Sequence, residues 1–216
     1  MVSSFQLSNH GAHMRISSKV AVATVAFIAS AAAFSQTQPA EVSPRQATAE
    51  PQHGDAMKTS SHSYDEQFLD TMAKHHEEAV QMAELVDSRS AHDKLKQMAK
   101  KTIDDQGAEI AQLREWKSQW FPNKGSAVNM KLPGMMQSMK GMSMEKLQSS
   151  QGDEFDAMFL DMMIKHHRGA LAMAQDAIKK SRHPEIVAFS KKVISQQQEE
   201  ISTMSRWKKE WKLAVH

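Results

Sequence analysis

Two pairs of adjacent histidines are the residues whose type and spacing suggest chemistry in this chain. His75-His76 and His166-His167 each follow Phe-Leu-Asp-x-Met-x-Lys and precede Ala and Met-Ala, so that residues 68–83 recur as residues 159–174. The offset between the two copies is constant, and each histidine pair is bracketed by methionines at the same positions: Met72, Met82, Met163 and Met173. Because imidazole nitrogens and thioether sulfurs both bind metal ions, the repeat indicates a metal site.

The spacing predicts that both histidine pairs point into the core of a helical protein. At ~100° per residue, the first pair shares a helix face with apolar residues such as Phe68 and Met72. The charged or amide side chains of this stretch fall on the opposite face: Lys74, Glu77, Glu78 and Gln81. A buried imidazole needs a hydrogen-bond partner or a metal ion. A lone inward histidine is usually structural, but two repeated pairs with flanking methionines favour metal ligands.

The composition narrows the choice of metal. The chain has no cysteine, which excludes disulfides, thiolate metal sites and thiol nucleophiles, but it has 17 methionines and 11 histidines. Imidazole and thioether without thiolate favour copper, and the methionine share favours Cu(I) over Cu(II). Di-iron bundles use Glu and Glu-x-x-His on inner helix faces. Here only Glu109 and Glu200 are expected to point inward.

The repeat extends over whole helical hairpins. We expect helices at about 64–87, 91–119, 153–181 and 184–213, with short turns inside each hairpin. Two amphipathic hairpins that share a core predict an all-α, ferritin-like four-helix bundle, in which residues 64–120 and 153–213 form one domain. Residues 121–152 form a long methionine-rich crossover, with a short helix expected at 143–149.

Other side chains are candidates for weaker roles. Six polar residues on the inner faces are expected to support the histidines or to join them as ligands: Asp65, Asp156, Gln106, Glu109, Gln197 and Glu200. Two turn histidines and the crossover methionines are candidates for an auxiliary metal site, although methionine is also a common packing residue: His92, His183, Met130, Met135, Met136, Met139, Met142 and Met144. The four tryptophans are expected to pack at the bundle ends.

The N-terminal region predicts export. Residues 1–35 have a short basic segment with Arg15 and Lys19, an apolar stretch and small residues before Gln36, as in a signal peptide, with Met14 as a second possible start. Residues 36–63 have the composition of a disordered tether. Without the signal, acidic and basic residues are equal in number, which gives no reason to expect nucleic acid as a partner. We expect a periplasmic or secreted protein that is not inserted in a membrane after cleavage.

These motifs resemble those of the DUF305 family, whose members are ferritin-like four-helix proteins of bacterial envelopes. The resemblance covers about residues 64–214 and includes Pro133–Met136, Met144–Leu147 and Gly152–Asp156 ahead of the second motif. Characterised members bind copper and support copper tolerance outside the cytoplasm. The resemblance therefore implies that the histidine pairs and their four bracketing methionines are copper ligands. Many members have proline where this chain has Lys74 and Lys165, so we expect straighter helices here.

The sequence thus predicts an exported protein that binds copper for sequestration, tolerance or hand-over, with a copper exporter or another envelope copper protein as partner. We expect no enzymatic activity, because no nucleophile–base arrangement or phosphate loop is visible. Two alternatives remain open. One is a ferritin-like metal oxidase acting on Cu(I) or Fe(II), with Glu109 and Glu200 as ligands. The other is a metal-free interaction protein whose polar core sets hairpin pairing.

Overall fold

The computed structural model describes residues 62–213. The expected signal peptide (1–35) and all but the end of the expected tether (36–63) lie outside these residues. Within the described part, every regular element is an α-helix, which confirms the all-α prediction. The elements are α1 (Tyr64–Ala83), α2 (Val86–Arg89), α3 (Asp93–Trp120), α4 (Met135–Met139), α5 (Met144–Ser149), α6 (Gly152–Lys180) and α7 (Pro184–Glu210).

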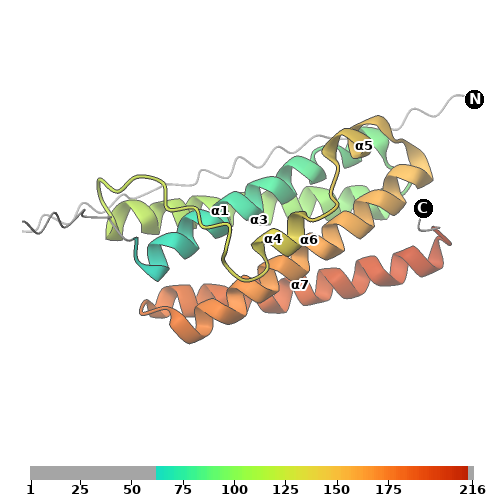
Figure 1. The fold of residues 1–216 in the computed structure, drawn as a ribbon. Coiled ribbons are helices and arrows are strands. Elements are labelled where there is room, and N and C mark those ends of the chain that lie inside the picture. The colour runs from blue at the N-terminus through green and yellow to red at the C-terminus, as the bar shows by residue number, and fades with distance from the viewer. Residues whose placement is uncertain (1–61, 214–216) are drawn as a thin grey trace, which may run out of the picture. The chain divides into compact units, whose positions relative to one another are not determined.

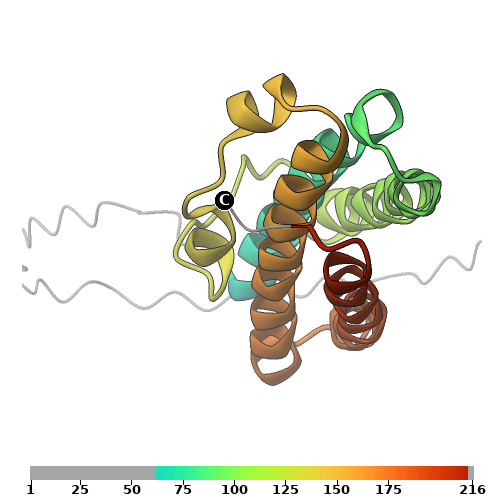
Figure 2. The same ribbon diagram turned by 90° about the vertical axis from the view of Figure 1, so that its right-hand side faces the viewer.

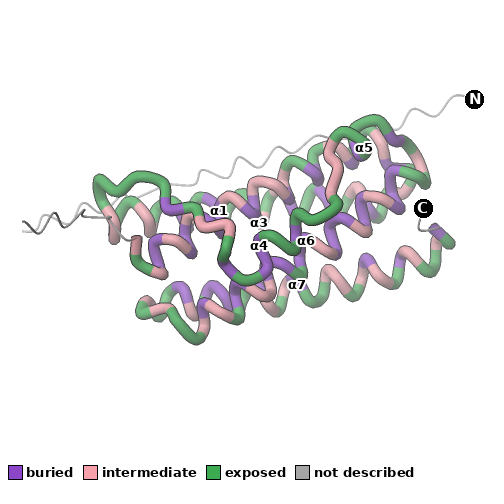
Figure 3. Tube along the Cα trace, viewed as in Figure 1, coloured by how far each residue is buried: buried purple, intermediate pink, exposed green. Residues whose placement is uncertain are grey.

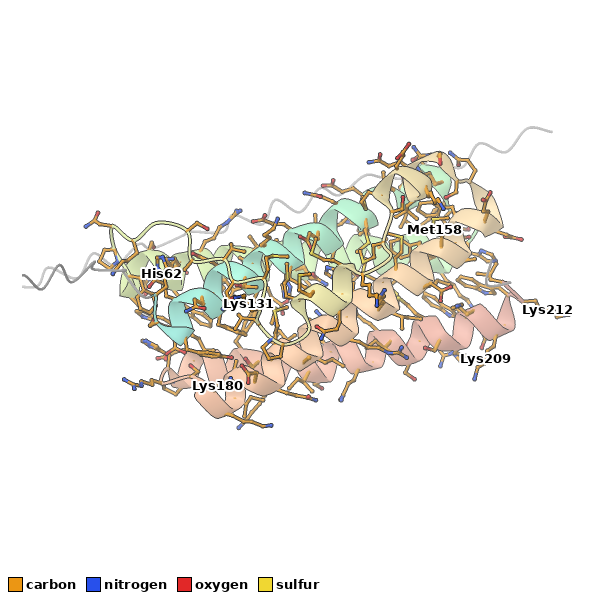
Figure 4. All side chains as sticks on the ribbon, viewed as in Figure 1. His62, Lys131, Met158, Lys180, Lys209 and Lys212 are labelled. Atoms are coloured by element: carbon orange, nitrogen blue, oxygen red, sulfur yellow. The ribbon has the colours of Figure 1, made fainter. Side chains whose placement is uncertain are left out.

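The four long helices form two hairpins. α1 packs along α3, α6 packs along α7, and contacts between α1 and α6 join the hairpins, as Figure 1 shows. Figure 4 places His62 and Lys180 at one end of these helices and Lys212 at the other. Among the described residues, none of the helices combines the length and hydropathy needed to cross a membrane.

Helix ends follow local hydrogen bonding. α1 begins where the Ser63 side chain accepts a hydrogen bond from the Glu66 backbone N–H at 3.2 Å, an N-cap. It ends at Ala83, four residues before the expected end at residue 87, and the next turn is tighter, because the Leu85 N–H bonds to the Met82 carbonyl only three residues back, at 3.2 Å. A separate turn, α2, then leads into α3. Pro184 occupies the first turn of α7, where a missing backbone N–H costs no helical hydrogen bond.

The buried side chains form two apolar clusters, and Figure 3 shows the corresponding buried stripes along the helices. The Phe159 cluster includes Met82 and Met163. The Phe68 cluster includes Met72 and Met173. The Phe68 cluster joins the start of α1 to the later part of α6, and the Phe159 cluster joins the end of α1 to the start of α6. The two helices therefore run antiparallel. The histidine pairs lie between these methionines in both helices.

The crossover adds a second short helix that the sequence analysis missed. α5 matches the expected short helix at 143–149, whereas α4 packs against α6, and Figure 2 shows both short helices on one side of α6. α4 approaches closely because Gly134 adopts a φ of 88° and Gly169 has no side chain: a Cβ on Gly169 would lie 2.5 Å from the Ser138 Cβ. The docking buries Met135 completely.

Candidate metal centre

The four histidines of the repeated motif meet in the core of the bundle. His75 and His76 are fully buried, and His166 and His167 are 1% exposed. The imidazole rings of His75 and His166 stack with their centroids 3.7 Å apart and their planes inclined by 30°. These two histidines occupy equivalent positions in the two repeats, so the stack joins corresponding residues of the two hairpins. The structure therefore brings one histidine of each pair together in the core, towards which the sequence predicts that both pairs point.

The outer histidine of each pair is held by a glutamate from the partner helix of its own hairpin. The Nε2 of His76 lies 3.0 Å from Glu109 Oε2, and the Nε2 of His167 lies 2.6 Å from Glu200 Oε2. The sequence analysis anticipated that these two glutamates would support the histidines or join them as ligands. With Nε2–H donating to the carboxylate, Nδ1 keeps its lone pair and is free to bind a metal ion.

The charge state of Glu109 fits this arrangement. Burial alone would raise the pKa of Glu109, but the hydrogen bond from His76, together with the positive charge of Lys192, holds its pKa below the usual value. Lys192 contributes because its Nζ lies 3.3 Å from Glu109 Oε1. Glu109 is therefore an ionised acceptor at neutral pH. A surface hollow between α3 and α7, lined by Glu109, Trp116, Phe189 and Lys192 among others, leads from solvent to this carboxylate.

Six imidazole nitrogens in the described core have no hydrogen-bond partner. They are both ring nitrogens of His75 and of His166, and the Nδ1 atoms of His76 and His167. Burial, with the neighbouring histidines, lowers the pKa of His75 well below its ordinary value. Burial likewise lowers the pKa of His166 to about 4, against an opposing effect of Glu78. Both rings are therefore neutral at pH 7, the form that binds metal ions.

Glu78 is a member of this centre that the sequence analysis missed. The helical wheel placed it on the solvent face, but it is largely buried, and its Oε2 lies 3.7 Å from His166 Nε2, outside hydrogen-bond distance. It turns inward because α1 packs against both α3 and α6, which widens its covered face. Its position one turn after His75 was the available signal. The second repeat has Gly169 at the equivalent position, where α4 docks.

The remaining inward candidates are buried, as the histidines are. All four bracketing methionines are buried, and Gln106 and Gln197 are buried with side-chain oxygens that lack a partner. Within residues 62–213, no three imidazole and carboxylate donors of this core lie within 4.8 Å of one another. The buried thioether sulfurs of the four methionines are further donors in this core, and they are of the type that soft metal ions prefer.

Asp65 and Asp156 do not support the core histidines, contrary to the sequence-based expectation. Asp156 accepts hydrogen bonds from the Ala91 N–H at 3.1 Å and from His92 Nδ1 at 2.7 Å, in the turn of the other hairpin. At the opposite bundle end, Asp65 accepts from the Arg182 N–H at 3.1 Å. Each aspartate therefore fastens the turn of the opposite hairpin, because the hairpins pack antiparallel and bring each helix start beside that turn.

The turn histidines and the tryptophans complete these two end clusters. His92 stacks on Trp211 with centroids 3.8 Å apart, and His183 stacks on Trp120 at 4.0 Å. A second tryptophan stacks on each of these tryptophans: Trp207 stacks on Trp211 at one end, and Trp116 stacks on Trp120 at the other. The tryptophans thus pack at the bundle ends, as predicted, and each clamps a histidine of the other hairpin.

The crossover methionines are dispersed rather than gathered at one point. Met135 is fully buried, Met136 and Met139 are 59% and 38% exposed, and Met130, Met142 and Met144 pack against the two apolar clusters. Met130 lies against the Phe68 cluster, whereas Met142 and Met144 lie against the Phe159 cluster.

Comparison with known structures shows that the fold is similar to that of CopM and of a DUF305 protein. The Cu(I)-bound form of CopM is 29% identical, with a TM-score of 0.59, and the match covers 69% of this chain and 99% of that one. The Cu(II)-bound form of CopM is 32% identical, with a TM-score of 0.59, covering 68% and 97% of the two chains. A DUF305 protein from Streptomyces coelicolor, 23% identical and with a TM-score of 0.61 over 71% and 97% of the chains, shares the fold.

The comparison with curated proteins gives no match. The family model described as "Domain of unknown function (DUF305)" matches residues 65–208, which is more than half of the chain and spans both hairpins and both histidine motifs. This chain therefore belongs to the DUF305 family.

Proposed function

We propose that this chain is an exported copper-binding protein that holds Cu(I) between the two hairpins, for sequestration, tolerance or hand-over rather than catalysis. The observation that carries the proposal is the set of six unpartnered imidazole nitrogens in one buried core. A buried polar group without a partner costs about 1–3 kcal/mol, so such a set calls for an explanation. A bound metal ion satisfies the lone pairs of several of these nitrogens at once.

The donor chemistry supports copper as the ion. Neutral imidazoles suit copper and zinc, and thioethers select Cu(I) among these ions. The methionines that flank the histidines in both repeats are fully or almost fully buried on either side of the cluster: Met72, Met82, Met163 and Met173. The copper-bound forms of the related CopM agree with this choice. Under this proposal, Glu109 and Glu200 orient His76 and His167 through hydrogen bonds.

An anaerobic competition titration with a Cu(I) chelator tests the proposal. The wild-type chain should compete for Cu(I), and a variant with His75, His76, His166 and His167 all replaced by alanine should lose that binding. A His92→Ala/His183→Ala double variant is the matched control, because it removes the same kind of ligand outside the core and should keep the affinity. Circular dichroism establishes that each variant is helical. Binding that survives the fourfold substitution would move the copper site to other residues, such as the crossover methionines.

A metal oxidase acting on Cu(I) or Fe(II) is the second candidate. It is favoured by the carboxylates in contact with the histidines, at 3.0 Å for Glu109 and 2.6 Å for Glu200, and by the inward position of Glu78. Histidine and glutamate together are the ligands of ferritin-like di-metal oxidases. An oxygen electrode distinguishes the two candidates: an oxidase consumes oxygen when Cu(I) or Fe(II) is added, whereas a passive binding protein does not consume it beyond the buffer rate.

A further inference from the structure

One end of the bundle gathers three metal-ligand side chains that belong to neither the core histidines nor the methionines. His92 comes from the turn before α3, and Asp153 and Asp156 come from the first turns of α6. One donor atom of each lies within 4.8 Å of the other two, and within the described residues 62–213 no other trio of histidine and carboxylate side chains does so. About 16 Å of helix separates Asp156 from His167, at 1.5 Å per residue, so the core histidines are remote.

The buried aspartate of this trio is only partly satisfied. Asp156 is completely buried; one oxygen accepts from the Ala91 N–H and from His92, while its other oxygen, Oδ1, has no partner. An unpartnered oxygen on a buried carboxylate is costly. A cation bound beside it would offset that cost, and Asp153, the other carboxylate of the trio, is exposed to solvent.

We propose that His92, Asp153 and Asp156 bind a divalent cation of borderline hardness, such as Zn²⁺, in a site separate from the core copper site. One imidazole and two carboxylates form a ligand set that zinc accepts, with water in the remaining position. The two carboxylates balance the charge of the ion. The set contains no thioether, so it discriminates against Cu(I), which the core favours. The bundle thus carries a soft site at its centre and a harder one at its end.

The opposite bundle end is a natural control within the same chain. Asp65, His183 and Trp120 repeat Asp156, His92 and Trp211, but His62 takes the place of Asp153. There the closest approach of His183 to Asp65 is 4.0 Å, and His62 pairs with Glu66 at 2.7 Å instead. Aspartate–histidine contact and tryptophan stacking at both ends explain hairpin docking. Only the end with Asp153 also assembles three ligands.

Calorimetric titration of the metal-free chain with Zn²⁺ tests the proposal. We expect a Zn²⁺ site that Asp153→Asn weakens at least tenfold. Glu154→Gln is the matched control, since Glu154 is also an exposed carboxylate of the first α6 turn, and it should leave the affinity unchanged. The variant that lacks all four core histidines should also keep this site, provided that circular dichroism shows it folded.

A second readout uses Trp211, which stacks on His92. Zn²⁺ should change tryptophan fluorescence in the wild type, and Trp211→Phe should remove most of that change, whereas Trp120→Phe should not. Three results would overturn the proposal: no Zn²⁺ binding, equal effects of Asp153→Asn and Glu154→Gln, or binding that disappears with the core histidines while Asp153→Asn leaves it intact.

Discussion

Acidification of the metal-free protein should weaken the fold through the buried imidazole of His166. Burial holds the pKa of this ring at about 4, compared with 6.5 for a free histidine. Between these pH values the unfolded chain binds a proton that the folded chain does not bind. The neutral His166 ring therefore contributes its full share to the free energy of unfolding above pH 6.5, and this contribution is lost as the pH drops towards 4. The difference corresponds to about 3 kcal/mol, at 1.36 kcal/mol per pH unit.

Other groups around this ring act in the same direction or oppose it. His75 stacks directly on His166, and burial also lowers the pKa of His75, so its protonation adds to the loss. Glu78 opposes the effect on His166, and the value of about 4 already includes that opposition. A loss of about 3 kcal/mol is a large share of the 5–15 kcal/mol by which native proteins are stable.

Urea denaturation of the metal-free chain from pH 7 to pH 4.5 measures this loss. His166→Gln removes the titrating ring, so the variant should lose at least 2 kcal/mol less than the wild type over this range. His183→Gln, which changes a partly exposed histidine at the bundle end, should follow the wild type. Equal losses in wild type and His166→Gln would refute the reasoning, because the acid sensitivity would then lie in groups outside the core cluster.

Two further predictions concern the docking of α4 and the affinity for Cu(I). Gly169→Ala should destabilise the protein by about 1–3 kcal/mol, because the new Cβ would lie 2.5 Å from the Ser138 Cβ. Gly107→Ala is the control: a Cβ there would meet nothing within 4 Å, so this variant should be more stable by about 0.5–1 kcal/mol. Thermal denaturation measures both changes. Lys192→Gln should raise Cu(I) affinity about two- to fivefold, because it removes a positive charge 3.3 Å from Glu109, while Lys191→Gln should have no effect in the same competition titration.

The repeat and its helical period were enough to predict the centre of the molecule. Inward orientation of His76 and His167 follows from spacing within one helix, and their mid-helix positions place them level with each other in any pairing of the hairpins. The glutamates at 109 and 200 follow from the antiparallel register inside each hairpin. These predictions depend only on helical periodicity and on the register within one hairpin, and both can be worked out from the spacing of residues in the sequence.

What the sequence could not predict depends on how the hairpins pack together. Glu78 faces inward because α6, from the second hairpin, covers a part of α1 that a helical wheel with one buried face assigns to solvent. Asp65 and Asp156 share a face with the histidines, yet they bond to turns of the opposite hairpin. The docking of α4 depends on the close approach that Gly134 and Gly169 allow, which the helix pattern of either segment does not show.

Anomalous diffraction at the copper edge, from crystals of the chain loaded anaerobically with Cu(I), tests the central claim most directly. The account predicts a copper peak between the two hairpins, within bonding distance of core imidazole nitrogens and of at least one bracketing methionine sulfur. Copper found only at the crossover methionines or at the bundle ends, with the core histidines still unligated, would contradict it.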